Sequence, residues 1–315
     1  MRILVIGASG FIGSSLAPML RDAGHQVVEA RRYVAGRWDG YQRTADRVFF
    51  DLRDTHETRA TIVEARPEVI LHLAAQSAVT YSFDHPQEVN DVNYMGTLRV
   101  AQAALELGAH LVLASSSEVY GDSAAYVPFA ETSRLGATSP YAVSKIAAEE
   151  YLRVLHQTQE LRMTILRPFN SIGRAPVNNR HFVVERAITQ ALEDGHISLH
   201  DPRPLRDFLF RTDHCRAYVA VVEHLAAAKG KTFNICTGDA WSIRDMAEYV
   251  AKAVGHRLGK TVTVDFGQMP DRPLDIPILQ GSASRAKAVL GWQPQYSIAQ
   301  GLDKAMDEWQ ARLGT

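Results

Sequence analysis

The sequence predicts an α/β fold, a doubly wound parallel sheet with a smaller C-terminal substrate-binding lobe. Short apolar runs alternate with amphipathic stretches through residues 2–168, the order expected of a parallel sheet wrapped by helices. A glycine-rich turn, "GASGFIG", follows the first apolar run directly. After residue 169 the alternation loosens into segments rich in Pro and Arg, which indicates a smaller lobe built around a site.

The elements follow from the lengths of the runs. Short apolar runs such as "RILVIG" and "HLVLAS" have the length of buried strands, and the segments between them have helical periodicity. We expect strands at 2–7, 26–30, 47–50, 69–74, 110–115 and 162–168, and helices at 11–23, 55–65, 86–107, 139–159, 213–228 and 242–255. We therefore divide the chain into a dinucleotide-binding domain, 1–169, and a lobe, 170–315, some segments of which return to the first domain.

Composition excludes several classes of protein. The 315 residues suffice for one large domain or two ordinary ones, and a net charge of −1 steers the protein toward neither nucleic acid nor an anionic membrane. Cys215 and Cys236 lack metal-ligand spacing, so we expect no metal site and a reduced, cytoplasmic protein. Glycines interrupt the apolar N-terminus, and no run approaches the roughly 20 residues of a membrane span.

The turn "GASGFIG" carries the first candidate site. Gly7, Gly10 and Gly13 lie between a strand and a helix, where absent side chains let backbone N–H groups and a helix N-terminus approach a pyrophosphate. The spacing is GxxGxxG rather than GxGxxG, and such glycines also occur for steric reasons alone. Its position after the first strand favours a dinucleotide site.

The end of the second strand indicates which dinucleotide. Where an acid would bind a free ribose 2′-hydroxyl, "EARRY" places Arg31 and Arg32, whose forked donors and fixed charge suit a 2′-phosphate. Glu29 is a weaker candidate, as a partner of a free 2′-hydroxyl. The alternative for the two arginines is that they are solvated loop charges without a role in binding. We expect NADP as the cofactor, with NAD as the alternative.

"SPYAVSK" carries the second candidate site. Tyr141 and Lys145 are four residues apart at the start of a helical pattern, so both side chains lie on one face. We expect the ammonium of Lys145 to lower the pKa of Tyr141, which makes the phenol an acid/base for a sugar hydroxyl or ketone. The alternative is a solvated pair on an ordinary helix.

Five motifs together resemble a known family. "GASGFIG", "HLAAQSAV", "SSSEVYG", "SPYAVSK" and "RPFNSIG", in that order, look like the extended short-chain dehydrogenase/reductase superfamily, in its nucleotide-sugar epimerase/dehydratase branch. The first half resembles GDP-mannose 4,6-dehydratases, whereas the tail "DIPILQGSASRAKAVLGWQP" looks more like GDP-4-keto-6-deoxymannose reductases. The resemblance implies NAD(P) across the carboxyl edge of the sheet, and a nucleotide sugar under the C-terminal lobe.

The resemblance also implies roles for individual residues. The catalytic residues would be Ser116, Glu118, Tyr141 and Lys145. Cofactor contacts would come from Gly7, Gly10, Phe11, Ile12, Gly13, Arg31, Arg32, Asp51, Leu52, Leu73, Ala74, Ala75, Ser115, Tyr141 and Lys145. Substrate contacts would come from Ser77, Ser117, Asn170, Val183, Arg206 and Arg272, and "RAPVNNRHFVV", 174–184, would pack near the base. The alternative for Arg206 and Arg272 is an ion pair with the adjacent Asp207 and Asp271.

Glu118 distinguishes the candidate reactions. In sugar 4,6-dehydratases a carboxylate here removes the C5 proton, and in many dTDP-sugar members an Asp before it acts as the acid. This chain has Ser117 there, which leaves acid catalysis to Glu118 or water. "SEVYG" also resembles UDP-glucuronate decarboxylases. If Glu118 is only a cap or an ion-pair partner, Ser116, Tyr141 and Lys145 would support a reductase.

We therefore expect an NADP-dependent nucleotide-sugar enzyme acting at C4, a 4,6-dehydratase of the GDP-mannose type. A 4-keto reductase, a decarboxylase or an epimerase are the enzymatic alternatives, and a non-catalytic dinucleotide-sensing protein is the alternative of another class. Helices 86–107 and 139–159 resemble those that pair in homodimers of this superfamily, so we expect a homodimer.

Overall fold

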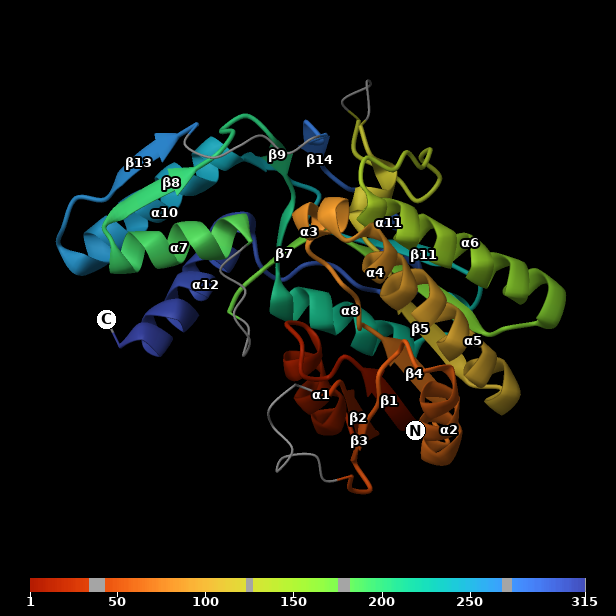
Figure 1. Cartoon of the computed structure of the whole chain (residues 1–315). Helices are drawn as coiled ribbons and strands as arrows, with labels where there is room; N and C mark the ends of the chain where they lie inside the picture. The colour runs from red at the N-terminus through yellow and green to blue at the C-terminus, as the bar shows by residue number, and fades with distance from the viewer. Residues whose placement is uncertain (34–42, 123–126, 175–181, 268–273, 315) are drawn as a thin grey trace.

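The centre of the molecule is a seven-stranded parallel sheet. The computed structural model describes residues 1–33, 43–122, 127–174, 182–267 and 274–314. The strand order is β11-β6-β5-β4-β1-β2-β3 (Figure 1). The strands are β1 (Arg2–Ile6), β2 (Gln26–Arg31), β3 (Arg47–Phe49), β4 (Val69–His72), β5 (His110–Ala114), β6 (Met163–Pro168) and β11 (Thr232–Ile235). After β3 the chain crosses back to the other side of β1, and this switch point opens the crevice where doubly wound sheets bind ligands.

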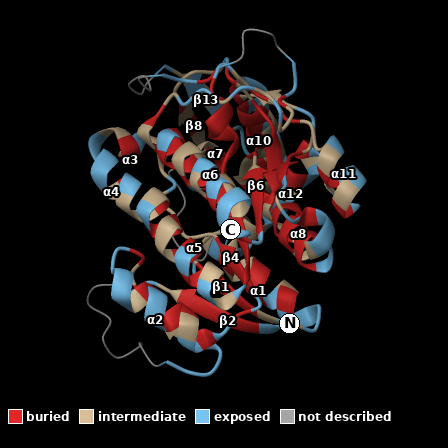
Figure 2. Cartoon of the chain, turned by 90° about the vertical axis from the view of Figure 1, so that its right-hand side faces the viewer, coloured by how far each residue is buried: buried red, intermediate tan, exposed pale blue. Residues whose placement is uncertain are grey.

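Helices cover both faces of the sheet. Alternate residues of β1 show why: Ile3 and Val5 pack into one hydrophobic core, whereas Leu4 and Ile6 pack into another. The first core contains residues of α1 (Gly13–Asp22), α8 (Arg211–Glu223), α9 (Leu225–Ala228) and α11 (Ser284–Leu290), and the second contains residues of α2 (Thr55–Ala65), α5 (Gly96–Leu107) and α6 (Pro140–Gln159). Figure 2 shows buried strands beneath helices with exposed outer faces. In the described ranges no helix combines the length and apolarity needed to span a bilayer.

The helix predicted at 86–107 contains a π-helical turn. After the short helix α3 (Val79–Asp84), α4 (Pro86–Asn90) runs through this turn, Asp91–Met95, into α5. Asn93 in the turn is buried, and its side chain accepts from the backbone N–H of Gln76 (2.8 Å) and donates to Oγ of Ser144 on α6 (3.1 Å). The turn therefore ties the segment after β4 to α6.

The C-terminal elements form a third core, separate from the two on the faces of the sheet. They are α7 (Val183–Glu193), β8 (His196–Leu199), α10 (Ile243–Leu258), β13 (Thr263–Phe266) and α12 (Ile298–Leu313), gathered at the end of the molecule away from β1–β3 (Figure 1). Short pairings join them to the rest: β7 (Asn170–Ile172) with β10 (Phe208–Phe210), and β9 (Leu205–Arg206) with β12 (Trp241–Ser242) and β14 (Ile278–Leu279). The sequence predicted neither these short strands nor β11, which lies in the central sheet.

A buried histidine at the start of β5 makes stability depend on pH. The ring of His110 lies 2.9 Å from Oγ1 of Thr164, and burial lowers the pKa of His110 from 6.5 to about 4. The unfolded chain therefore binds a proton below pH 6.5 that the folded protein does not. Stability from this residue is present above pH 6.5 and is lost as pH falls toward 4.

We expect His110→Gln to flatten the acid side of the stability curve. Between pH 6.5 and 4 its free energy of unfolding should fall less steeply than that of the wild type, by up to about 1.4 kcal/mol per pH unit. Urea unfolding at several pH values measures the slopes, with the exposed His56→Gln as the control. Equal slopes for His110→Gln and the wild type would contradict this assignment.

Candidate active site

A cavity of about 1150 Å³ opens at the carboxyl edge of the sheet. Its wall combines residues of the central sheet with residues of the C-terminal lobe, such as Val183 and Leu199. Every site residue named from the sequence lines this cavity, with the exception of Arg272. Arg272 and the stretch 175–181 of "RAPVNNRHFVV" lie outside the described residues.

The glycine turn forms one end of the cavity. Gly7 has a φ of +93°, and a Cβ there would lie 2.8 Å from the backbone N of Ala74. A Cβ on Gly13 would lie 2.2 Å from the carbonyl oxygen of Gly7. No side chain caps the N-terminus of α1, where Ile12 is the N-cap residue. The turn thus brings backbone and an uncapped helix end to the cavity wall, as a pyrophosphate site requires.

The two arginines after the glycine turn differ in their surroundings. Nη2 of Arg31 donates to Glu29 (2.5 Å), which also binds Arg21 (2.6 Å). Although burial opposes ionisation, these two guanidiniums hold the pKa of Glu29 below its usual value. Arg32 is exposed at the cavity wall. A 2′-phosphate would meet Arg32 directly, whereas Arg31 is already bound to a carboxylate.

Asp51 lies at the same end of the cavity, after β3. Its carboxylate accepts from Nε (3.0 Å) and Nη2 (2.6 Å) of Arg53, and the pKa of Asp51 is lowered chiefly by this contact. With this carboxylate already bonded, the neighbouring Leu52 supplies an apolar surface on the cavity wall.

Helix α6 is joined to the end of β5 by two contacts one turn apart. Nζ of Lys145 donates to the carbonyl oxygen of Ala114 (2.8 Å). One turn later, Oε1 of Glu149 accepts from Oγ of Ser115 (2.5 Å). Ser115 lines the cavity as expected of a cofactor residue, but its hydroxyl is bonded to Glu149.

The next residue of the strand end makes a third contact. The hydroxyl groups of Ser116 and Tyr141 are hydrogen-bonded, and Oγ of Ser116 also accepts from the backbone N–H of Glu118 (3.2 Å). This second bond caps the 3₁₀ turn Ser117–Tyr120. The turn places Glu118 on the cavity wall, where it is buried and acts electrostatically on Tyr141. The side chain that caps this turn is therefore that of Ser116 and not that of Glu118.

The predicted lowering of the Tyr141 pKa is wrong for this arrangement. Burial raises the pKa of Tyr141 to about 12; the bond to Ser116 opposes the shift, and Glu118 adds to it. Burial also lowers the pKa of Lys145 to about 8, against the opposing charge of Glu149. Lys145 lies with Nζ 5.9 Å from the Tyr141 ring centroid, bonded to Ala114, so desolvation dominates both residues.

Two predicted substrate residues lie on the lobe side of the cavity. The side-chain nitrogen of Asn170 is buried and has no hydrogen-bond partner among the described residues. Nη2 of Arg206 donates to Asp275 (2.8 Å), and its Nη1 donates to the carbonyl oxygen of Ile276 (2.7 Å). The alternative prediction, an ion pair between Arg206 and Asp207, is wrong. It accepts instead from backbone and hydroxyl groups of Thr237 and Gly238.

Sequence reasoning missed several cavity residues. His214 and Tyr218 of α8 line the cavity with their rings 5.4 Å apart, and Nδ1 of His214 lies 2.8 Å from Oγ of Ser171. Burial lowers the pKa of His214 to about 3, so the imidazole is neutral. Glu185 of α7 is also on the wall, and burial raises its pKa to about 8. The spacing of four between His214 and Tyr218, shortly after "RDF", is a signal that could have indicated them.

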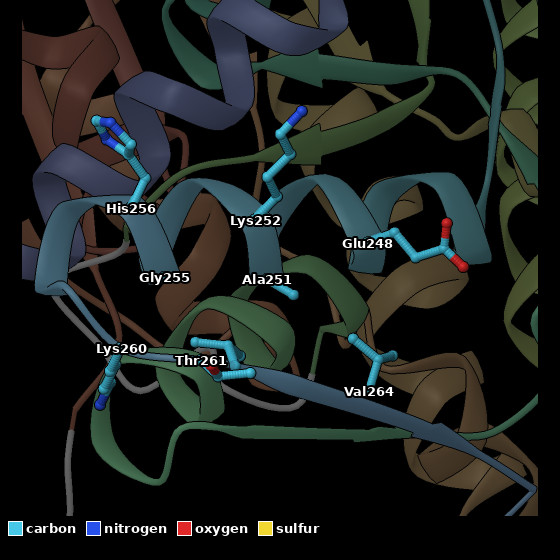
Figure 3. A pocket seen from close by; sticks show the side chains of 9 residues that line it. Glu248, Ala251, Lys252, Gly255, His256, Lys260, Thr261 and Val264 are labelled. Carbon is cyan, nitrogen blue, oxygen red and sulfur yellow. The ribbon is translucent and has the colours of Figure 1, made fainter.

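A shallower hollow lies away from these residues, between α10 and β13. It measures about 440 Å³ and is lined by Glu248, Lys252, His256 and Lys260 among others. Figure 3 shows Lys252 and His256 on the side of α10 away from Thr261 and Val264. The predicted site residues that the structure describes belong to the larger cavity, so we assign the hollow no role.

Comparison with known proteins gives a family and close structural neighbours. Residues 4–305 match the family model described as GDP-mannose 4,6 dehydratase. The UDP-glucose 4-epimerase of Mycolicibacterium smegmatis is 34% identical over 322 residues, covering 98% of each chain. The UDP-glucose 4-epimerase of Thermus thermophilus in complex with NAD has a TM-score of 0.86 at 29% identity, covering 98% of this chain and 99% of that one. RMD from Pseudomonas aeruginosa complexed with NADPH has a TM-score of 0.80 at 28% identity, covering 99% of each.

Proposed function

The chain belongs to the family described as GDP-mannose 4,6 dehydratase, within the nucleotide-sugar branch of the extended short-chain dehydrogenases/reductases, and on this premise we propose that it is a nucleotide-sugar 4,6-dehydratase. The observation that carries the proposal is the buried Glu118, on the same cavity wall as Ser116 and Tyr141. Oxidation and reduction at C4 need only Ser116, Tyr141 and Lys145. A carboxylate beside them adds a base for C5.

The cavity fits a nicotinamide dinucleotide. Its glycine turn and the uncapped start of α1 suit the pyrophosphate, and Arg32 suits a 2′-phosphate. A bound dinucleotide would accept the hydride of C4 and return it to C6. Lys145 would lie beside the nicotinamide ribose, as the family resemblance implies.

The residues of the chain would move the protons. Tyr141, hydrogen-bonded to Ser116, would take the proton of the C4 hydroxyl as the hydride leaves C4, and would then release it to water, because the product keeps the C4 ketone. The resulting C4 ketone acidifies C5, and Glu118 would remove the C5 proton. The C6 hydroxyl would then leave as water, with its proton supplied by Glu118 or by water. As the hydride adds to C6, C5 would regain a proton from Glu118 or from water. On the lobe side, the side-chain nitrogen of Asn170 would donate to the diphosphate.

A 4-epimerase is the second candidate, favoured by the 34% identical relative. In that reaction the sugar would be oxidised and reduced at C4 alone, by Tyr141 and Ser116. Glu118 would then have no proton to move. Its burial on the cavity wall favours the dehydratase.

Mass spectrometry of the product tests the proposal. The protein is incubated with GDP-mannose, its 4-keto-6-deoxy derivative, UDP-glucuronate, UDP-glucose and dTDP-glucose, each with NADP⁺ and with NADPH, and the products are separated by chromatography before their masses are measured. We expect one sugar to lose water without net consumption of NADPH. A gain of two hydrogens would establish a reductase, loss of CO₂ a decarboxylase, and a new sugar of unchanged mass an epimerase. Cofactor binding without any of these would favour the sensing protein.

Glu118→Gln and Tyr141→Phe should fail at different steps. Tyr141→Phe should slow C4 oxidation by about 100- to 10,000-fold, the value of a positioned acid/base. Glu118→Gln keeps the shape but removes the base, so C4 oxidation should persist while exchange of the C5 hydrogen in heavy water and loss of water stall. Rapid quench with mass spectrometry follows both. Undiminished turnover of Glu118→Gln would exclude the dehydratase.

We propose NADP as the cofactor, because Arg32 lies exposed at the cavity wall where the adenosine ribose would bind. Arg32→Ala should weaken NADPH by roughly one to two orders of magnitude, the value of a charge-assisted contact, and leave NADH unchanged. Fluorescence titration measures both, with Arg59→Ala, an exposed residue outside the cavity wall, as the control. Equal affinity of the wild type for NADPH and NADH would contradict the proposal.

We propose a homodimer through α5 and α6, as the family resemblance implies. Large apolar side chains are exposed there: Met95 in the π turn is 36% exposed, and Val143 and Val154 on α6 are 55% and 53% exposed. Light scattering should give a dimer at micromolar concentration. Val143→Glu combined with Val154→Glu should give a monomer, whereas Val127→Glu, equally exposed elsewhere, should not. A monomeric wild type would contradict the assembly.

A further inference from the structure

A buried ion pair lies behind the catalytic residues. The side chains of Glu149 on α6 and Arg167 on β6 are 0% and 1% exposed. Nε of Arg167 donates to Oε1 of Glu149 (2.9 Å) and Nη2 donates to Oε2 (2.5 Å), a bidentate arrangement. Oε2 also accepts from Arg153 (2.7 Å) and Oε1 from Ser115 (2.5 Å). One carboxylate therefore joins α6 to the ends of β5 and β6.

The contacts continue on the far side of Arg167. Its Nη1 donates to the hydroxyl of Tyr120 (2.9 Å), which donates to Asn234 of β11 (2.5 Å). The guanidinium also lies over the Tyr120 ring, 4.9 Å from its centroid. Tyr120 ends the 3₁₀ turn that carries Glu118. The same network thus holds that turn from behind, opposite the cavity.

Stability alone does not account for this network. Burying an ion pair costs desolvation, and well-packed apolar residues often stabilise as well or better. What the pair adds is a fixed geometry, because each oxygen of Glu149 has defined donors from different elements. Glu149 and Lys145 are four residues apart on one face of α6, and they bind Ser115, directly after β5, and Ala114, the last residue of β5.

We propose that Glu149 is a positioning residue that fixes, through Ser115 and Arg167, the register in which α6 presents Tyr141 and Lys145 to the end of β5. A one-residue slip along this end would move Ser116 away from Tyr141. The inference rests on the proposed C4 chemistry, since it assigns a role to residues behind that site.

The charge of Glu149 has a second effect, on Lys145. Burial lowers the pKa of Lys145 to about 8, and Glu149 opposes that shift. The Tyr141 ring on the same helix lies 5.9 Å from Nζ of Lys145, and His72 on β4 interacts with Lys145 electrostatically. Arg167 on β6 is bonded to Glu149, and Glu118 lines the same cavity wall. The pKa of His72 is about 3 and that of Tyr141 about 12, so neither titrates near pH 8. Glu185, on the lobe side of the cavity wall, also has a pKa of about 8, so the part of the alkaline limb that moves when Glu149 is changed reports on Lys145.

Ser115→Ala tests the positioning role with little change to the ion pair. We expect kcat to fall roughly 10- to 100-fold with the KM for the sugar unchanged, because a small misplacement of catalytic groups costs that much. Ser115→Thr keeps the hydroxyl and should restore most of the rate. Thr189→Val, which deletes a buried hydroxyl of α7 outside the cavity wall, is the control for stability. Wild-type kcat for Ser115→Ala would overturn the register role.

Glu149→Gln combined with Arg167→Met tests the charge. Removing both members avoids leaving one charge buried alone, and thermal unfolding checks that the double variant folds. The alkaline limb of kcat should move to lower pH, because Glu149 is the charge that raises the pKa of Lys145. The affinity for NADPH should decline with pH over the same shifted range. Unshifted profiles in a folded double variant would overturn the role of the charge.

The two measurements separate this inference from the proposed function. A wild type that binds NADPH but converts no nucleotide sugar refutes the proposed function. The pH dependence of NADPH binding still tests the action of Glu149 on Lys145 in that case, because it needs no substrate. Shifted binding in the double variant supports the role of Glu149, and unshifted binding overturns it.

Discussion

The geometry of the site depends on how α6 sits against the end of β5. Helix α6 carries the phenol and the ammonium, and the chain after β5 carries the hydroxyl and the carboxylate, so neither element forms the site alone. Lys145 and Glu149 fix their register through Ala114 and Ser115. The bidentate pair between Glu149 of α6 and Arg167 of β6 holds α6 in this register, because a shift of the helix would break both hydrogen bonds. The sheet positions this anchor because β5 and β6 are adjacent parallel strands.

Burial sets the protonation of the site. It raises the pKa of Tyr141 to about 12 and lowers that of Lys145 to about 8, so at neutral pH the phenol stays protonated while the ammonium is only modestly favoured. The phenol is therefore ready to donate a proton to an oxygen at C4. Accepting one requires stabilisation of the phenolate as it forms, and the hydrogen bond from Ser116 supplies part of it. The carboxylate of Glu118 opposes that change, which couples the two acid/base groups.

Much of the fold could be predicted from periodicity. The six strand runs and the helices around them appear within a few residues of their expected bounds, because strands buried on both faces give continuous apolar runs. The strand β11 escaped detection, since "TFNI" is a short run inside a helical region. The short pairings of the lobe escaped for a related reason. Strands of two or three residues carry no periodicity, and they form only because another segment supplies their hydrogen-bond partners.

The sequence by itself determined the sheet, the glycine turn and the co-occurrence of Ser116, Glu118, Tyr141 and Lys145, because local patterns and motif order encode them. Tertiary structure decided which groups each side chain meets. Arg206 is adjacent to Asp207 in the chain yet pairs with Asp275, since successive side chains of an extended segment point to opposite sides. Ser115 was assigned to the cofactor but binds Glu149. The pKa of Tyr141 rises rather than falls, because desolvation depends on every element packed around the residue and not on the lysine four positions along its helix.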